Sequence, residues 1–331
     1  MPERAEELRA AVLAVRAASR VCLAVQEHLV GALEKSDKSP VTVADFASQA
    51  IVCRSLAAAL PGDPIVGEEA SDALREPGNA GLLAAVVEHV AAEIGARPSR
   101  DEVLGWIDHG GAEAKGRRYW TLDPIDGTKG FLRREQYAVA LGLIEDGRVV
   151  LGVLGCPSLP TPGGGRGALF AAAAGAPARA FPLADGAASD GLPIAVDRIA
   201  EASKARFCES VESGHSNQQE SARIAELLGI TSEPYRIDSQ CKYAAVARGD
   251  ASIYLRMPTR EDYREKIWDH AAGMLVVESA GGRVTDVDGH PLDFGRGSTL
   301  AGNRGIVATS GRIHGDVLDA IRRVRGAQRG S

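Results

Sequence analysis

The sequence predicts a layered protein of the α/β or α+β class, in which helices and sheets alternate. Two observations support this prediction. Alanine- and leucine-rich segments with apolar residues at helical spacing recur along the 331 residues, and short apolar runs typical of strands lie between them. A chain of this length has enough core for two domains or for one large domain.

The first half of the chain is expected to hold three helices and four strands. Helical spacing covers residues 4–34 and resumes at Phe46 after a loop that contains Ser39-Pro40, and Pro61 ends the second helix. Shorter elements follow: a strand at 64–69, a helix at 81–95, a strand at 117–127, and a strand pair at 137–157 joined by the hairpin signal Glu145-Asp146-Gly147.

The second half begins with a Pro- and Gly-rich segment, residues 157–167, which is expected to form a hairpin loop near a domain boundary. We therefore expect an N-terminal domain at 1–156 and a C-terminal domain at 157–331. Strand patterns and helices alternate beyond the boundary, with strands at 167–175, 251–257 and 282–287 and helices at 218–228, 239–248 and 269–280.

The composition is that of an ordinary globular protein, with 45% apolar and 25% charged residues. The net charge of −6 argues against a nucleic-acid polymer as partner, because such partners favour a basic face. The five cysteines are scattered without a CxxC pair, and neither a signal peptide nor a run of about 18 apolar residues is present. A cytoplasmic protein without a membrane role is expected.

Acidic residues stand at three predicted strand or helix ends. Asp123 and Asp126 end the strand at 117–127, Glu68 follows the strand at 64–69, and Asp269 precedes an apolar helix. Each has a structural alternative, because Asp-Pro and Asp-Gly form turns and Asp269 could cap its helix. Carboxylate oxygens are also the ligands of Mg²⁺, and a phosphate often completes its coordination.

A helix that opens at Gly127-Thr128 would offer backbone N–H groups to a phosphate oxygen. Together with the acidic groups, this favours metal-assisted attack of water on a phosphate ester.

The motifs "DPIDGTKGF", "GEE" and "WDHAAG" together resemble those of the Mg²⁺-dependent, Li⁺-sensitive phosphatases related to inositol monophosphatase. Longer segments are similar to the 3'(2'),5'-bisphosphate nucleotidases of yeast and plant type: "KSDKSPVTVADFASQ", "DPIDGTKGFLRREQYAVAL" and "DSQCKYAAVARGDASIYLRMP". The resemblance runs from about residue 8 to residue 312. It implies an alternating αβαβα sandwich and a cytoplasmic monomer or homodimer that acts on a small phosphorylated nucleoside or nucleotide.

The resemblance also implies a metal site with two to three Mg²⁺ ions. Its ligands would be Glu68, Asp123, Asp126, Asp269 and the main-chain carbonyl of Ile125. Two neighbouring cations can clamp the attacking and leaving oxygens of an in-line displacement.

Asp45 resembles the general base of the family, and Thr128 would share the activated water with it. A carboxylate of ordinary pKa suffices, because metal coordination lowers the pKa of the water. The alternative role for Asp45 is to cap a helix before Phe46, and the two roles are compatible.

Residues that match the nucleotide-binding positions of the family include His215, Ser239, Lys242 and Arg256, with Gly127 and Thr128 also at the substrate. Lys242 and Arg256 would bind a second phosphate, the 5'-phosphate of adenosine 3',5'-bisphosphate. The alternatives are a loop histidine at His215 and solvated surface cations at Lys242 and Arg256.

Hydrolysis of the 3'(2')-phosphate of adenosine 3',5'-bisphosphate is the leading hypothesis. Two other substrates stay open: a modified nucleoside phosphate in a dedicated pathway such as nucleoside antibiotic synthesis, and inositol 1,4-bisphosphate. A non-catalytic binding protein would be signalled by loss of a metal carboxylate or of Thr128, and all of these residues are present.

Overall fold

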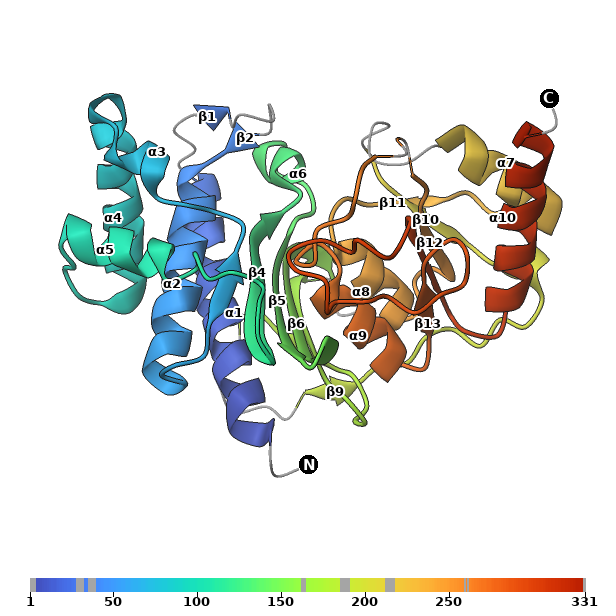
Figure 1. Cartoon of the computed structure of the whole chain (residues 1–331), viewed down its shortest axis with the longest axis horizontal. Helices are drawn as coiled ribbons and strands as arrows, with labels where there is room; N and C mark the ends of the chain where they lie inside the picture. Colours follow the sequence, from blue (N-terminus) through green and yellow to red (C-terminus); the bar gives the residue numbers. More distant parts are fainter. Residues whose placement is uncertain are drawn as a thin grey trace.

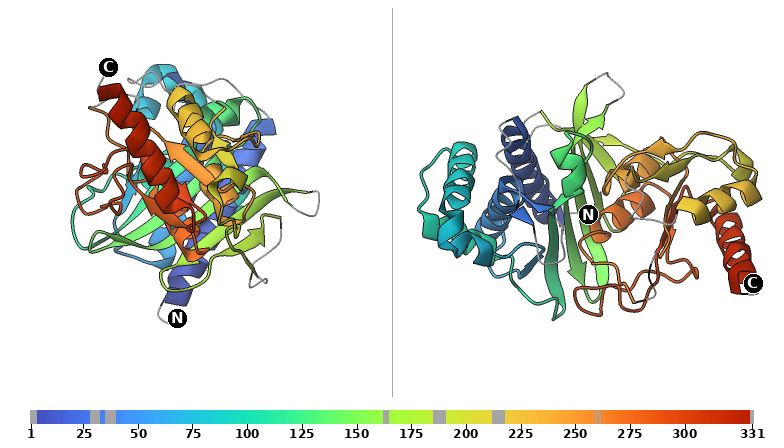
Figure 2. Two further views of the ribbon diagram at one scale, coloured as in Figure 1. Left: turned by 90° about the vertical axis from the view of Figure 1, so that its right-hand side faces the viewer. Right: turned by 90° about the horizontal axis from the view of Figure 1, so that it is seen from above.

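The computed structural model describes residues 4–27, 33–34, 40–161, 165–184, 191–211, 218–258, 260 and 262–329. Helical layers alternate with two β-sheets across the long axis of the molecule (Figure 1). The view from above separates the same layers (Figure 2). The predicted αβαβα sandwich is therefore confirmed.

The first layer contains α1 (Ala5–Glu27) and α2 (Val43–Ala59), which pack on each other and on the first sheet. α1 ends before the predicted helix of residues 4–34 does. Leu33–Glu34 (β1) instead pairs antiparallel with Pro40–Val41 (β2). A strand pair needs extended backbone, so one continuous helix to residue 34 was the wrong prediction.

Helix starts in this layer are set by capping boxes. Thr42 caps α2: its Oγ1 accepts from the Ala44 N–H at 3.1 Å, and the Asp45 carboxylate accepts from the Thr42 N–H at 2.7 Å. Ser99 and Glu102 form a second box, which starts a helix that the sequence analysis missed. The outer helices are α3 (Asp72–Arg75), the 3₁₀ turn Pro77–Asn79, α4 (Ala80–Ile94) and α5 (Arg100–Asp108).

The charged residues of the helices are relevant to the predicted absence of a membrane role. α1 spans 23 residues, but it carries Glu6, Glu7, Arg9, Arg16 and Arg20. Within the described ranges, no helix combines the length and the apolarity that a bilayer crossing requires.

The first sheet has seven strands among the described residues, in the order β3-β4-β5-β6-β7-β8-β9. β3 and β4 are parallel, and the other neighbours pair antiparallel. The strands are β3 (Ile65–Gly67), β4 (Arg118–Asp126), β5 (Ala138–Glu145), β6 (Arg148–Pro160), β7 (Arg166–Ala173), β8 (Arg179–Pro182) and β9 (Leu192–Pro193).

The predicted hairpin joins β5 to β6 through Asp146 and Gly147, whose φ angles are 47° and 73°. Two positive φ angles are typical of the tight turns that match strand twist. β6 continues past residue 156, where the predicted N-terminal domain ends, and the sheet extends to β9. The change to the second sheet therefore comes after residue 193, and the two-domain division stays a prediction.

The remaining layers follow along the chain. α8 and α9 lie between the two sheets and contact both of them, while α7 packs with α10 beyond the second sheet (Figure 1). The second sheet has the order β11-β10-β12-β14-β13. These elements are the 3₁₀ turn Ala202–Lys204, β10 (Phe207–Glu209), α7 (Gln218–Leu228), β11 (Tyr235–Arg236), α8 (Cys241–Ala247), β12 (Ile253–Arg256), α9 (Ala271–Ser279), β13 (Arg283–Thr285), β14 (Ile306–Thr309) and α10 (His314–Arg329).

Two glycines of β6 allow helices to pack closely on both faces of the first sheet. A Cβ at Gly155 would lie 2.3 Å from Ser19 Oγ of α1, and a Cβ at Gly152 would lie 2.7 Å from the Ala272 carbonyl oxygen of α9. Residues three apart in a strand face opposite sides, which matches this arrangement. The close approach fixes the start of α9, and with it Asp269, relative to the sheet.

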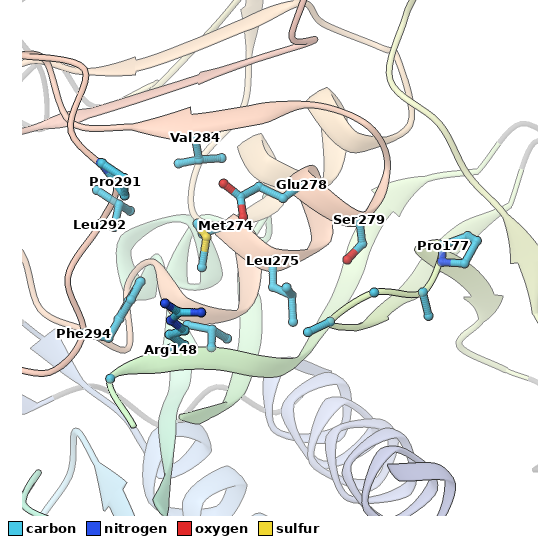
Figure 3. Close-up of a pocket in the computed structure, with 15 residues that line it drawn as sticks. Arg148, Pro177, Met274, Leu275, Glu278, Ser279, Val284, Pro291, Leu292 and Phe294 are labelled. Atoms are coloured by element: carbon cyan, nitrogen blue, oxygen red, sulfur yellow. The ribbon is translucent and has the colours of Figure 1, made fainter. Parts of the chain in front are cut away.

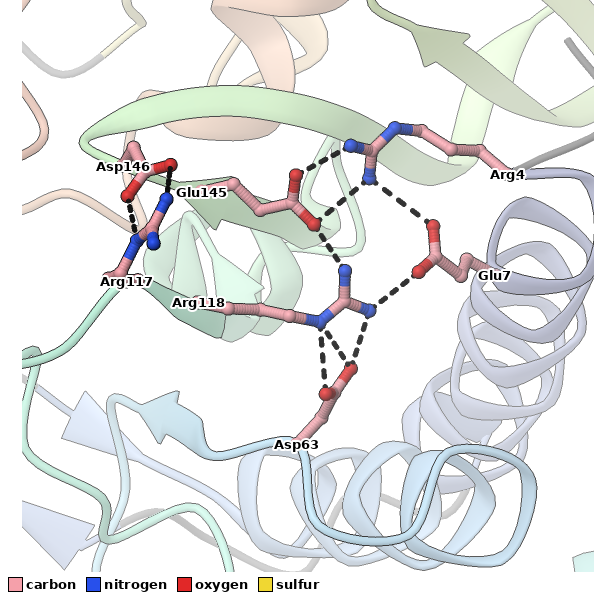
Figure 4. Close-up of polar contacts among 7 residues, drawn as sticks. All are labelled: Arg4, Glu7, Asp63, Arg117, Arg118, Glu145 and Asp146. Carbon is pink, nitrogen blue, oxygen red and sulfur yellow. Dashed lines mark hydrogen bonds and ion pairs between the residues drawn. The ribbon is translucent and has the colours of Figure 1, made fainter.

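Arg118, at the start of β4, joins α1 to the sheet through an ion-pair cluster with Glu7, Asp63, Glu145 and Arg4 (Figure 4). Its Nη2 lies 2.6 Å from a Glu7 oxygen and 2.8 Å from Asp63 Oδ2, and its Nη1 binds Glu145. Arg4 pairs with Glu145 at 2.5 Å. Each carboxylate of this cluster therefore has an arginine partner.

Candidate functional site

A cavity of about 300 Å³ lies where the ends of β4 and β12 meet the segments that precede α8 and α9. Ten of the twelve predicted site residues line it: Glu68, Asp123, Ile125, Asp126, Gly127, Thr128, Ser239, Lys242, Arg256 and Asp269. Asp45 is not among the lining residues, and His215 lies outside the described residues. Segments up to two hundred residues apart in the chain thus converge at one place.

A β-bulge brings Asp123 and Asp126 to the same cavity. The register between β4 and β5 pairs Asp123 with Ala140 and Asp126 with Ala138, so three steps on β4 match two on β5. Without the extra residue, side chains three apart would face opposite sides of the sheet. Pro124 sits inside the bulge, where its missing N–H breaks no ladder bond.

Hydrogen bonds hold the bulge in place. Asp123 Oδ1 accepts from the Ile125 N–H at 3.1 Å, and the Pro124 carbonyl accepts from Ser48 Oγ of α2 at 2.8 Å. Thr128 Oγ1 lies 3.3 Å from the Ile125 carbonyl oxygen, its acceptor. The Asp-Pro and Asp-Gly pairs, which could have formed a simple turn, therefore belong to a bulge at the end of a strand.

Glu68 reaches the cavity because β3 is parallel to β4. Gly67 is in register with Leu122, and the Glu68 N–H donates to the Leu122 carbonyl at 3.1 Å. Carboxyl ends of parallel strands meet at one edge of a sheet. Gln49 of α2 fixes the following residue: its Nε2 donates to the Glu69 carbonyl at 2.6 Å, and its Oε1 accepts from the Glu69 N–H at 3.1 Å.

Gly127 follows the bulge in a left-handed conformation, with φ of 89°, and starts the five-residue helix α6 (Thr128–Leu132). A Cβ at this position would lie 2.9 Å from Ser239 Cβ. Any other residue would meet both backbone strain and this contact. Ser239 itself has a φ of 65°, so the two segments meet in unusual conformations at the cavity wall.

Gln240, which the sequence analysis did not single out, connects three segments of the site. Its N–H donates to Asp126 Oδ2 at 2.5 Å, its Nε2 donates to the Trp268 carbonyl at 2.9 Å, and its Oε1 accepts from the Gly273 N–H at 3.1 Å. It is 2% exposed, so every one of these groups is removed from water. A glutamine carries no charge signal in a sequence, which is why its role was missed.

Arg133 and Asp238 also form a link that the sequence analysis missed. Arg133 pairs with the buried Asp238, and Asp238 Oδ1 accepts from the Val211 N–H at 3.0 Å. The end of α6 is thereby tied to the segment before α8.

The local structure also corrects two alternatives. Asp45 does not cap α2, because Thr42 is the N-cap; Asp45 is the third residue of the helix and belongs to the capping box. Asp269 does not cap α9 either, because His270 occupies the N-cap position.

Burial raises the pKa of Asp126, although Lys242 and Arg256 act in the opposite direction. The pKa of Asp269 is raised well above its ordinary value, again chiefly by burial and further by the charges of Asp126 and Glu68. Charged carboxylates in such a place are unfavourable unless a cation joins them. The four carboxylates and the Ile125 carbonyl offer the hard oxygen donors that Mg²⁺ requires, so the residues present fit this ion.

Four cationic side chains line the same cavity, among them Lys242 and Arg256. Lys242 is 4% exposed, and its Nζ lies 5.3 Å from the centre of the Tyr254 ring. Burial lowers the pKa of Lys242, and the charge of Asp126 opposes that effect. Burial would also lower the pKa of Arg256, but Glu265, Tyr254 and Asp269 hold it above its ordinary value. The alternative of solvated surface cations therefore does not hold, because Lys242 is buried and Arg256 is partly buried and paired with Glu265.

A second, larger cavity of about 750 Å³ lies along α9 (Figure 3). Its wall is mainly apolar, with Met274, Leu275 and Phe294, and among its lining residues Glu278 is the one carboxylate. One carboxylate cannot form a divalent-cation site by itself. This larger cavity therefore lacks the cluster of carboxylates that lines the smaller one.

Comparisons with known proteins agree with this geometry. A family model described as "Inositol monophosphatase family" matches residues 4–325. A 3'(2'),5'-bisphosphate nucleotidase of Emericella nidulans is 44% identical over 90% of this chain and 92% of its own length. The protein of the same name from Schizosaccharomyces pombe is 43% identical over 95% of this chain and 94% of its own.

Solved structures give the same fold. An inositol monophosphatase from Anabaena (Nostoc) sp. PCC 7120 aligns with a TM-score of 0.64 at 22% identity, over 98% of this chain and 97% of that one. An inositol monophosphatase from Thermotoga maritima aligns with a TM-score of 0.65 at 20% identity, over 96% of each chain.

Proposed function

The chain belongs to the inositol monophosphatase family, and on that premise we propose that it hydrolyses the 3'(2')-phosphate of adenosine 3',5'-bisphosphate to AMP and phosphate. Members of this family are generally Mg²⁺-dependent and lithium-sensitive phosphatases. The nucleotidase names of the relatives at 43–44% identity support the nucleotide as substrate.

The observation that carries the proposal is the presence of two cations, the buried Lys242 and the partly buried Arg256, in the cavity that the four carboxylates line. A substrate with one phosphate would need only the part of the cavity that the carboxylates line. A second phosphate, which is not cleaved, would give both cations a further partner at the cavity. Charge-assisted hydrogen bonds of this kind are stronger than neutral ones.

We assign the metal-holding role to Glu68, Asp123, Asp126, Asp269 and the Ile125 carbonyl, with two or three Mg²⁺ ions. Bound Mg²⁺ supplies Lewis-acid stabilisation of the phosphate charge and lowers the pKa of water. Gly127, Thr128 and Ser239 form the wall next to these ligands, so they can orient the phosphate that is cleaved. In the reaction, a water oxygen bonds to phosphorus, the ester P–O bond breaks, and the leaving ribose oxygen gains a proton.

We assign acceptance of the water proton to Asp45, with Thr128 as its partner. Asp45 is 1% exposed and lies in the first turn of α2. β2, which directly precedes that turn, contacts α6, and Thr128 is the first residue of α6. The Thr42 N–H and Oγ1 each lie 2.7 Å from Asp45 Oδ2 and fix the orientation of the carboxylate.

The base of the nucleotide has aromatic surface available at the same cavity. Tyr263 and Trp268 are lining residues, and Tyr263 is 42% exposed. Stacking on aromatic side chains tolerates every base. Selectivity for adenosine over other nucleosides is therefore expected to be modest, and His215 remains a proposed nucleotide contact.

The five cysteines are buried free thiols, which supports a reducing compartment, and we propose that the reaction takes place in the cytoplasm. The enzyme is proposed to act as a monomer or homodimer.

The proposal is tested by phosphate release from a panel of substrates in Mg²⁺. The panel contains adenosine 3',5'-bisphosphate, adenosine 2',5'-bisphosphate, adenosine 3'- and 2'-monophosphate, inositol 1,4-bisphosphate and inositol 1-phosphate. We expect the highest kcat/KM with the nucleoside bisphosphates. A preference for a mono-phosphorylated nucleoside would favour the dedicated-pathway alternative, and a preference for inositol 1,4-bisphosphate would favour that substrate. Turnover that survives Glu68→Ala would contradict the metal assignment.

A further inference from the structure

Arg256 reaches the cavity from the end of β12, and two carboxylates pair with its guanidinium. Its Nε lies 2.8 Å from Glu265 Oε2, and its Nη2 lies 3.8 Å from Asp269 Oδ2. The Glu265 side chain is 7% exposed, so this ion pair is largely shielded from solvent. A free arginine side chain would lose rotamer entropy when it binds a phosphate. An arginine that is already fixed loses less.

Glu265 is in turn held by two fully buried aromatic side chains. His270 Nε2 lies 3.2 Å from the same Glu265 Oε2, and His270 Nδ1 lies 2.9 Å from the Tyr243 hydroxyl. As a neutral imidazole, His270 has one N–H that donates and one ring nitrogen that accepts. Glu265 can only accept, so Nε2–H donates to it and the Tyr243 O–H donates to Nδ1. One chain of hydrogen bonds therefore runs from Tyr243 to Arg256.

This chain of side chains does not have the character of a metal centre. Atoms of Glu265, Asp269 and His270 lie within 4.8 Å of one another, as metal ligands could. The guanidinium of Arg256 already supplies the cation, and Glu265 Oε2 already accepts two hydrogen bonds. A support for Arg256 accounts for these contacts without any ion.

We infer that Glu265, backed by His270 and Tyr243, is the positioning residue that fixes the Arg256 guanidinium at the cavity wall and thereby sets the preference for substrates with a second phosphate. The inference rests on the proposed function, because it assigns Arg256 to the phosphate that is not cleaved. Glu265 occupies Nε at 2.8 Å, whereas Nη2 has longer contacts, 3.5 Å to the Tyr263 hydroxyl and 3.8 Å to Asp269 Oδ2, so the terminal nitrogens can still bind that phosphate. Preorganisation of this kind raises affinity without any new contact to the ligand.

Two variants test the inference. Glu265→Gln keeps the size of the side chain and removes its charge, and Tyr243→Phe keeps the ring that packs on Gly273 and removes only the hydroxyl. The measured quantity is the ratio of kcat/KM for adenosine 3',5'-bisphosphate to that for adenosine 3'-monophosphate. We expect Glu265→Gln to lower this ratio by roughly 3- to 10-fold and Tyr243→Phe by about 2-fold, mainly through the KM of the bisphosphate.

Asp262→Asn is the matched control. Asp262 also pairs with an arginine of the same loop, Arg260, but the pair is about 70% exposed and does not line the cavity. The control should leave the ratio unchanged. Glu265→Gln in an Arg256→Ala background should cause little further loss of the ratio, because the residue through which it acts is gone.

Three outcomes would overturn the inference: an unchanged ratio in both variants, an equal loss on both substrates together with a lower thermal midpoint, or full additivity with Arg256→Ala. A wild-type enzyme without preference for the bisphosphate would instead refute the proposed function, and that result is visible before any variant is made. If Glu265→Gln does not fold, Tyr243→Phe and its double variant with Arg256→Ala still test the inference.

Discussion

Two clusters of carboxylates in this molecule have opposite electrostatic character. In the ion-pair cluster, the pKa of Glu145 is lowered by hydrogen bonds from Arg4 and Arg118. Partial burial raises the pKa of Asp63, but hydrogen bonds from Arg118 and Trp120 still hold this pKa below the ordinary value. In the cavity, burial raises the pKa of Asp126 and Asp269. The same residue type is thus stabilised as an anion in one place and destabilised in the other.

The difference teaches how the fold separates stability from function. The ion-pair cluster lies at the far end of β4, where Arg4, just before α1, and Arg118 of β4 pair with the carboxylates (Figure 4). At the other end of the same strand, burial makes the charged forms of Asp126 and Asp269 unfavourable for the protein alone, and the same carboxylates are suited to binding Mg²⁺. A change in the ion-pair cluster should therefore alter stability, whereas a change in the cavity should alter activity.

The largest effect is expected from a metal ligand. Asp126→Asn keeps an oxygen that can accept from the Gln240 N–H, but removes a charge that Mg²⁺ needs. Loss of Lewis-acid stabilisation and of an activated water should lower kcat/KM by about 10⁴-fold or more. The thermal midpoint without Mg²⁺ should stay equal to that of the wild type or rise, because a carboxylate with a raised pKa destabilises the fold at neutral pH.

Phosphate release and thermal unfolding with and without Mg²⁺ check this expectation. Asp146→Asn is the control, since Asp146 is an exposed turn residue whose positive φ suits asparagine. Full activity of the wild type in EDTA, or a large fall in the metal-free midpoint of Asp126→Asn, would contradict the contrast between the clusters.

The next effect concerns Asp45, a buried carboxylate held by the cap of its own helix. Asp45→Asn removes the proton acceptor and should lower kcat by about 10²–10⁴-fold. Weakening of the cap should lower the free energy of unfolding by no more than about 0.5–2 kcal/mol. Mg²⁺ should still raise the thermal midpoint as it does in the wild type. A wild-type kcat in Asp45→Asn would mean that another group accepts the proton.

Arg256→Ala tests the cations of the cavity. A charge-assisted contact contributes roughly 1.5–3 kcal/mol, so kcat/KM for adenosine 3',5'-bisphosphate should fall by about 10–150-fold. Adenosine 3'-monophosphate should be affected little, because it has no second phosphate. Arg260→Ala, an exposed arginine of the same loop, is the control. Equal losses on both substrates would make Arg256 structural or a contact to a group that both share.

Much of the fold was predictable, because apolar periodicity reports packing. The β5–β6 hairpin and α7 lie where the sequence placed them. The errors have local causes. β1 and β2 are two-residue strands whose pairing leaves no periodic signal, and β6 continues through a segment whose Pro and Gly residues predict a loop. α5 could have been found from Ser99 and Glu102, a capping-box pattern.

The site was predictable where chemistry needs charge. The carboxylates were identified because their residue types stand out beside glycines and strand ends, and Lys242 and Arg256 were identified because they match the nucleotide-binding positions of the family. Gln240 and Gln49 were missed, since amides that bind backbone groups carry no such signal. The bulge at Asp123–Asp126 was also missed, because register depends on the partner strand and is not visible in one segment.

The smallest effect is expected in the ion-pair cluster. Arg118→Met keeps the length of the side chain but leaves Glu7, Asp63 and Glu145 without their shared partner. Partly exposed pairs contribute little each, so the free energy of unfolding should fall by only about 1–2 kcal/mol and the thermal midpoint by about 2–5 °C. Arg117→Met is the control, because Arg117 forms one exposed pair with Asp146 in the same view (Figure 4). kcat should be unchanged in both variants.

The pH dependence of this loss gives the sharper test. The pKa values of Asp63 and Glu145 are lowered in the folded protein, so their contribution to stability is present above the pKa of the unfolded chain and is lost as pH falls through the folded pKa. Unfolded carboxyl groups titrate near pH ~4. The difference in thermal midpoint between wild type and Arg118→Met should therefore be constant from neutral pH down to about pH 5 and shrink below about pH 4. A difference that persists in acid would show that Arg118 acts through packing of its aliphatic chain and not through the ion pairs, and the contrast with the cavity would then lose its electrostatic basis.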